Sequence, residues 1–220
     1  MMSPRFRFLA VAVLVCLAPA ARAQYYSYGL PDNNPVRWHI MGGYSQPVGD
    51  ADSLLQGGWH FGFGVTWHQP ESPFALRLDI DYATNNATNH LLDEASSAKL
   101  QFTGGWADFW TGTLNGEFRI PLTPVATAYL IAGGGAYYTR MSFTELGYGY
   151  VCNPWWYYCY PGVGEYVVDS KDVTKFGWNA GAGVFWRLRG GTQLFVEGRY
   201  NEVKLNQTIS WVPVTIGLRF

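Results

Sequence analysis

The chain has 220 residues, enough for one domain, and its formal net charge of −1 leaves no basic excess that would attract nucleic acid. Charged residues make up only 14% of the sequence, whereas aromatic residues reach 17% and glycines number 26. This composition disfavours an extensive charged surface in water and is typical of a membrane barrel with aromatic girdles.

The first 23 residues have the three parts of a secretory signal peptide. Arg5 and Arg7 form a positive segment, Phe8 to Ala20 is apolar, and Ala21-Arg22-Ala23 has the small-x-small form of a cleavage site. The apolar part is too short for a helix that spans a bilayer, which needs about 20 residues. We therefore expect a cleaved signal peptide over residues 1–23, a periplasmic lead-in over 24–35 and a folded domain over 36–220.

Eight later segments alternate between apolar and polar positions, as a β-strand does when its two faces meet different environments. In the third segment, for example, Leu76 and Leu78 fall on one face, and Arg77 and Asp79 fall on the other. The fifth segment is apolar or glycine on both faces, so its inward face stays open. The predicted strands are residues 36–44, 59–68, 74–83, 108–120, 125–140, 175–188, 193–201 and 210–220.

The apolar faces of these strands must meet lipid, because the opposite faces are too charged to form a shared core. A membrane sheet must also close on itself, since an open edge would leave unpaired backbone groups in hydrocarbon. An even number of strands permits antiparallel closure. The sequence therefore predicts an all-β fold, an eight-stranded antiparallel up-and-down transmembrane β-barrel in a Gram-negative outer membrane.

The connections between the strands alternate in length, as they do in outer-membrane barrels. The connections that contain proline or glycine are short, and we expect them to be periplasmic turns; they span residues 69–73, 121–124 and 189–191. Three others are long and should lie outside the cell, at residues 46–58, 85–106 and 141–170. The fourth outer connection, 202–207, is short.

Two cysteines remain after the signal peptide, Cys152 and Cys159, both in the longest outer connection. In an exported protein the default interpretation is a disulfide. A metal site is the weaker alternative, because no histidine lies nearby and two thiolates do not complete a tetrahedral set.

Three runs carry a resemblance to a known family: Phe195 to Tyr200, the ending Val212 to Phe220, and the glycine-rich Ala132 to Tyr137. With them, the chain resembles the small outer-membrane β-barrel domain family, which includes opacity-type proteins and OmpA-, OmpX- and OmpW-like barrels. The resemblance implies that the barrel assembly machinery reads the alternate apolar residues of the last strand. Those residues are Val212, Val214, Ile216, Leu218 and Phe220. The family shares an architecture and not an activity.

The inward faces hold charges of both signs, which we expect to pair in a network that fills the lumen, since an eight-stranded barrel is only wide enough for its own side chains. Asp79 and Asp81 could instead form an acid/base pair, although structural ion pairs explain such carboxylates more often. The sequence indicates no catalytic set, metal site or cofactor. The expected lumen network is Arg37, His39, His60, Arg77, Asp79, Asp81, Glu117, Arg119, Lys175, Arg187, Glu197, Arg199 and Arg219.

These features favour a non-enzymatic protein that supports envelope structure or contacts a partner through its outer loops. Its expected partners are outer-membrane lipid and lipopolysaccharide, the assembly machinery, and an extracellular ligand at residues 141–170; we expect a monomer and no nucleic acid. The contact candidates are Trp155, Trp156, Tyr157 and Tyr158. They could instead rest on the barrel rim as part of an aromatic belt.

Two other functions stay open at this stage. The first is an OmpW-like conduit for small hydrophobic solutes, which needs an apolar pocket at the outer end near Met41, Phe109 and the fifth strand. The second is a lipid-A-modifying enzyme, although the chain has no His-x-Ser pair of the deacylase type.

Overall fold

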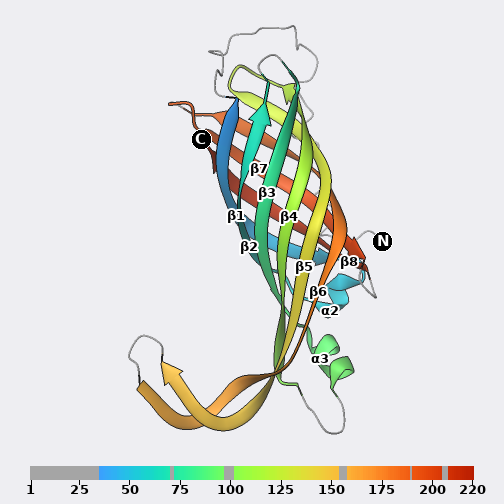
Figure 1. Cartoon of the computed structure of the whole chain (residues 1–220), viewed down its shortest axis with the longest axis vertical. Helices are drawn as coiled ribbons and strands as arrows, with labels where there is room; N and C mark the ends of the chain where they lie inside the picture. Colours follow the sequence, from blue (N-terminus) through green and yellow to red (C-terminus); the bar gives the residue numbers. More distant parts are fainter. Residues whose placement is uncertain (1–34, 70–71, 97–101, 154–157, 189, 205–207) are drawn as a thin grey trace, which may run out of the picture.

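Eight antiparallel strands form a closed barrel in the computed structural model (Figure 1). The structure describes residues 35–69, 72–96, 102–153, 158–188, 190–204 and 208–220. The expected signal peptide (1–23) and all but the last residue of the expected lead-in (24–35) lie outside these ranges, so both stay predictions.

Each strand pairs with the next along the chain, and β1 pairs with β8 to close the ring. The predicted eight-stranded antiparallel up-and-down barrel is therefore confirmed. The strands are β1 (Val36–Val48), β2 (Gly58–His68), β3 (Phe74–Asn86), β4 (Gly104–Pro121), β5 (Ala126–Asn153), β6 (Tyr158–Arg187), β7 (Gln193–Lys204) and β8 (Thr208–Arg219).

The two faces of the barrel wall differ as the alternation predicted. On β3, Leu78 is 51% exposed on the outside, whereas the neighbouring Arg77 is fully buried in the lumen. The structure also orients β5, which the sequence left open: Tyr129 and Ile131 point inward, and Leu130 points outward. The middle of the outer surface is consequently apolar, and the charged side chains at that depth lie inside the barrel.

The third outer connection differs from the prediction. Residues 141–170 were expected to be a loop, but β5 and β6 continue through most of that range as a two-stranded hairpin. The pairing runs on to Cys152 and Cys159, which face each other and form the predicted disulfide. The segment is rich in valine and tyrosine, which favour strands, but its glycines interrupt the alternation of apolar and polar residues by which a strand is recognised.

This hairpin continues where its neighbours stop. β4 last pairs with β5 at Thr144, and β7 last pairs with β6 at Gly177. Figure 1 shows the paired strands leaving the end of the barrel and curving away from it. We call the part from Glu145 to Asn153 and from Tyr158 to Tyr166 the outer hairpin.

The other two long connections contain short helices, α2 (Ala51–Leu54) and α3 (Asn89–Ala95), where the sequence predicted only loops. The Thr88 side chain caps α3 by accepting a hydrogen bond from the Leu91 amide. A single β-bridge between Leu55 and Ala87 ties the two connections together at the outer end. No helix in the described part of the chain is long and apolar enough to cross a membrane.

A substitution at the lipid-facing wall should cost far more stability than the same substitution on the outer hairpin. Leu78 and Leu146 are similarly exposed, at 51% and 54%, but only Leu78 lies midway along the barrel wall. We expect Leu78→Arg to lower the free energy of unfolding in lipid vesicles by about 2–4 kcal/mol, as at other bilayer midplanes. Leu146→Arg should change it by less than about 0.5 kcal/mol. Equal effects in denaturant titrations would contradict a lipid-facing wall.

Candidate functional site

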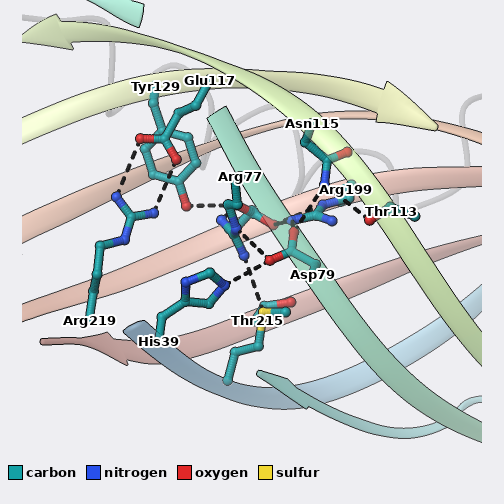
Figure 2. A network of polar contacts seen from close by, with 12 residues as sticks. His39, Arg77, Asp79, Thr113, Asn115, Glu117, Tyr129, Arg199, Thr215 and Arg219 are labelled. Atoms are coloured by element: carbon teal, nitrogen blue, oxygen red, sulfur yellow. Dashed lines mark hydrogen bonds and ion pairs between the residues drawn. The ribbon is translucent and has the colours of Figure 1, made fainter. Parts of the chain in front are cut away.

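The lumen holds a closed ring of four charged side chains, two from β3 and two from β7. Three of them, Arg77, Asp79 and Arg199, are labelled in Figure 2. Arg77 donates to Asp79 at 2.8 Å and to Glu197 at 2.7 Å. Arg199 donates to the same two carboxylates, at 3.0 Å to Asp79 and 2.6 Å to Glu197. Positive and negative groups therefore alternate around the ring, and its formal charges cancel.

His39, Asn115 and Tyr129, which come from three other strands, complete the hydrogen bonding of this ring. The His39 ring nitrogen Nε2 lies 2.7 Å from Asp79, and the Asn115 amide donates to Asp79 at 3.1 Å. The Tyr129 hydroxyl donates to Glu197 at 2.8 Å. All four ring members are at least 95% buried, so these bonds replace the water that the charges lost.

A second ion-pair group lies nearer the periplasmic end. Arg219 donates to both oxygens of Glu117, at 3.3 and 3.1 Å, and Arg119 donates to Glu117 at 2.7 Å. The guanidinium of Arg219 also lies 5.5 Å from the ring centres of Phe185 and Phe195, within cation–π range. Charge and aromatic packing together fill this end of the lumen.

Asp81 lies apart from these bonds. In the described part of the chain it has no ion pair, and it lines a small cavity together with His60, Arg199 and Thr215. The cavity volume is about 20 Å³, room for about one water molecule. Asp79, the other half of the acid/base alternative, is fully engaged in the ring, so the two carboxylates do not act as an isolated pair.

For two predicted members of the lumen network the prediction is wrong. Lys175 and Arg187 are both exposed. Lys175 precedes Gly177, the last β6 residue that pairs with β7, and so it lies beyond the rim of the barrel wall. Arg187 is the last residue of β6 at the opposite rim. Their alternation is that of inward residues, but both lie at the rims: no β7 residue pairs with Lys175, and Arg187 belongs to the last pair of β6 with β7.

The remaining predicted members lie along the inner wall. Arg37 is buried near the periplasmic end and donates to the backbone carbonyl of Gly191 at 2.8 Å. His60 is buried and lies 3.2 Å from the Thr215 hydroxyl. No group of three or more His, Cys, Asp or Glu side chains within the described ranges is placed to hold a metal ion.

Apolar side chains fill the outer end of the lumen, a feature that the sequence analysis missed. The Phe109 ring stacks on Trp211 with their centres 4.8 Å apart, and Tyr137 packs edge-on against Trp211 at 5.7 Å. Leu55, next to α2, joins this cluster and is 2% exposed. The conduit alternative needs Phe109 to line an apolar pocket, whereas Phe109 is 1% exposed and packs against Trp211. The Leu54–Leu55 pair in an otherwise polar connection was the available signal.

On the outside of the wall, near the same end, aromatic side chains hold two carboxylates. The Tyr82 hydroxyl and the Trp106 indole both donate to Asp108, at 2.7 and 3.0 Å. In the same way, Trp178 and Tyr200 donate to Glu202, at 3.3 and 3.0 Å. Trp and Tyr side chains with satisfied polar ends are typical of a membrane–water boundary.

Of the four outer-loop contact candidates, only Tyr158 lies in the described part of the chain, and it is 65% exposed. Trp155, Trp156 and Tyr157 lie outside the described residues. Tyr148 and Tyr150, two further aromatic residues of the same connection, are 92% and 71% exposed on the outer hairpin.

The residues of the expected assembly signal line the outer face of β8. Val214, Ile216 and Phe220 are each more than half exposed, and Val212 and Leu218 are partly exposed. Their outward orientation agrees with the alternation, and their recognition by assembly machinery stays a prediction.

Comparison with solved structures finds small barrels of the same type. The neisserial surface protein NspA gives a TM-score of 0.52 at 13% sequence identity, over 84% of this chain and 96% of that one. A major outer membrane protein from Thermus thermophilus gives 0.51 at 11% identity, over 85% and 99%. No protein-family model matches the sequence, and no curated protein matches it either.

A closed eight-stranded barrel with an apolar outer wall, aromatic boundary residues and a charged interior is the architecture of small bacterial outer-membrane proteins. The chain has the fold of these outer-membrane β-barrels. The similarity is one of fold, and the site has to define the function.

Removing one carboxylate from the central ring should destabilise the barrel strongly. Asp79→Ala leaves Arg77 and Arg199 buried with Glu197 as their only carboxylate partner, which should cost about 3–5 kcal/mol. The exposed Lys175→Gln and Arg187→Gln variants serve as charge-changing controls and should stay within about 0.5 kcal/mol of the unmodified protein. Urea unfolding in lipid vesicles measures all three variants. A mild Asp79→Ala effect would show that the ring does not hold the barrel together.

Proposed function

We propose that this protein is a non-enzymatic component of the outer membrane that presents the outer hairpin as a contact surface. The observation that carries the proposal is the length of β5 and β6, which have 28 and 30 residues and extend past both neighbouring strands. A membrane strand needs only about 9–11 residues, so crossing the bilayer does not account for the hairpin.

The side chains of the outer hairpin support a role in contact. Leu146, Tyr148 and Tyr150 are each more than half exposed, on one strand and at alternate positions. Large exposed apolar and aromatic groups gathered in one region are typical of interaction sites. The disulfide near the tip holds the two strands together, which lowers the entropy lost when a partner binds.

We further propose that the lumen is closed to solutes. Three layers support this: the Glu117–Arg219 group, the central ring, and the apolar cluster around Phe109 and Trp211. The cavity beside Asp81 is about 20 Å³, far below the size of a ligand site. Passage of hydrophobic solutes, as in an OmpW-like conduit, would require the Phe109–Trp211 stack to separate.

The remaining expectations are also proposals. They are an exported monomer with a cleaved signal over residues 1–23 and a lead-in over 24–35, surrounded by lipid and lipopolysaccharide. The outward residues of β8 fit recognition during assembly, since with Phe220 they form one apolar face.

The contact role can be tested by removing the outer hairpin and leaving the barrel. Glu145 and Tyr166 face each other across the strands, so Asn-Gly can replace residues 146–165 as a two-residue turn. The shortened protein should still fold, as shown by heat-modifiable migration on gels. Cells expressing it should lose at least tenfold in retention on a panel of immobilised proteins and glycans. Full retention by the shortened protein would contradict a contact role for the hairpin.

The closed lumen can be tested by electrical recording in planar bilayers. We expect the unmodified protein to show no steady conductance. The double variant Phe109→Ala/Trp211→Ala removes the stacked rings of the outer layer, and it should still not conduct, because the central ring remains. Steady current or uptake of a hydrophobic dye through the unmodified protein would support the conduit instead.

A further inference from the structure

The outer hairpin has two strand edges, one along β5 and one along β6, and only one of them is protected against the addition of another strand. Beyond Thr144 no described strand other than β6 pairs with β5, and beyond Gly177 towards the tip none other than β5 pairs with β6. Both edges therefore present unpaired backbone groups. An exposed strand edge is a template for another strand, and proteins usually protect it with proline, charge or a bulge.

The backbone directions of the hairpin follow from its hydrogen bonds. The Arg187 amide donates to the Val125 carbonyl, so odd-numbered residues of β5 point their backbone groups toward β6, and even-numbered residues point them away. The Thr144 carbonyl, which accepts from the Thr103 amide on the β4 side, agrees. The residues that open onto the outer edge of β5 are therefore Leu146, Tyr148, Tyr150 and Cys152.

The edge of β6 is protected. Pro161 lies opposite Tyr150. In an antiparallel pair, two opposite residues either both point their backbone groups toward the partner strand or both point them away from it. Since Tyr150 points away, the amide hydrogen that Pro161 lacks would have faced the outer edge of β6. The register also shifts between Phe143 and Thr144: Thr144 faces Val167 and Phe143 faces Asp169, which leaves Val168 as an extra residue on β6. Such a bulge disrupts strand addition.

The edge of β5 has no such protection. Between Glu145 and Cys152 it contains no proline and no lysine, and its pairing with β6 is regular. Its edge-directed residues also carry the exposed side chains Leu146, Tyr148 and Tyr150 on one face. A strand added here would gain backbone hydrogen bonds and an apolar contact along that face.

Charge selects the kind of strand. Residues 145–168 contain two charged side chains, Glu145 and Glu165, and no lysine or arginine. Glu145 lies on β5 opposite Tyr166, and Glu165 lies on β6 opposite Leu146, so both carboxylates lie at the base of the outer hairpin. A second copy of this chain would bring two more acidic groups to the same place, whereas a basic segment would complement them.

We infer that the outer edge of β5 from Glu145 to Cys152 binds an extended basic segment of another protein, which adds to the hairpin as a third strand. This inference rests on the proposed contact function and specifies its partner. Alternate apolar residues of the segment would pack beside Leu146, Tyr148 and Tyr150, and a lysine or arginine would lie near Glu145.

The test uses the full chain in lipid nanodiscs and a pool of synthetic nine-residue peptides. The peptides carry apolar or aromatic residues at alternate positions and one lysine or arginine; a second pool has the same composition with a central proline. We expect the first pool to bind at least tenfold more tightly than the second. In hydrogen exchange, the amides of Leu146, Tyr148 and Tyr150 should become protected, and the amide of Val163 should not.

Two proline variants form a matched pair, because Tyr148 and Val163 face each other and both direct their amides outward. Tyr148→Pro removes an amide from the β5 edge and should weaken peptide binding at least tenfold. Val163→Pro removes one from the β6 edge and should leave binding within twofold. Tyr148→Thr keeps the amide and measures the loss of the side chain. Retained exchange protection of the odd-numbered β5 amides shows that each hairpin is intact.

Several results would overturn the inference. They are equal binding of the two peptide pools, equal binding by Tyr148→Pro and the unmodified protein, or protection at the β6 edge. Concentration-dependent cross-linking of the chain through β5 without peptide would assign the edge to a second copy instead. If the shortened protein loses cell retention while Tyr148→Pro keeps it, the contact function stands and the edge inference fails.

Discussion

The absence of water inside the bilayer is the constraint on which the rest of the structure depends. Every backbone amide and carbonyl at membrane depth must find a partner within the protein, and only a closed ring of strands gives each one a neighbour on both sides. The pairing of β1 with β8 meets this demand. Closure in turn creates an interior that lipid cannot reach, and charged side chains can be placed there.

The fold was largely predictable because the two sides of each strand meet opposite environments. On β3, for example, the apolar Leu76 and Leu78 face lipid, and the charged Arg77 between them faces the lumen. On β5 the code fails, because Ala132 and Gly134 face lipid while Gly133 and Gly135 face the lumen, and small residues suit both. Only its register with β4 and β6 settles which way it faces.

The site was less predictable, because alternation tells which face a residue occupies and not how far the wall continues. Arg77 and Lys175 follow the same rule, but neighbouring strands enclose the first and not the second. Each charge of the central ring has one of its two partners four strands away around the barrel, and no local pattern encodes that distance. The outer hairpin was missed for a related reason, since no core or lipid imposes alternation on a ribbon in water.

The central ring is built from residues that lie two apart on the same strand: Arg77 with Asp79 on β3, and Glu197 with Arg199 on β7. Glu117 and Arg119 repeat the arrangement on β4. Each of these three pairs therefore cancels its own charge within one strand, before that strand meets any other. During insertion these six residues could enter the bilayer as neutral pairs, which costs less than moving each charge into hydrocarbon alone.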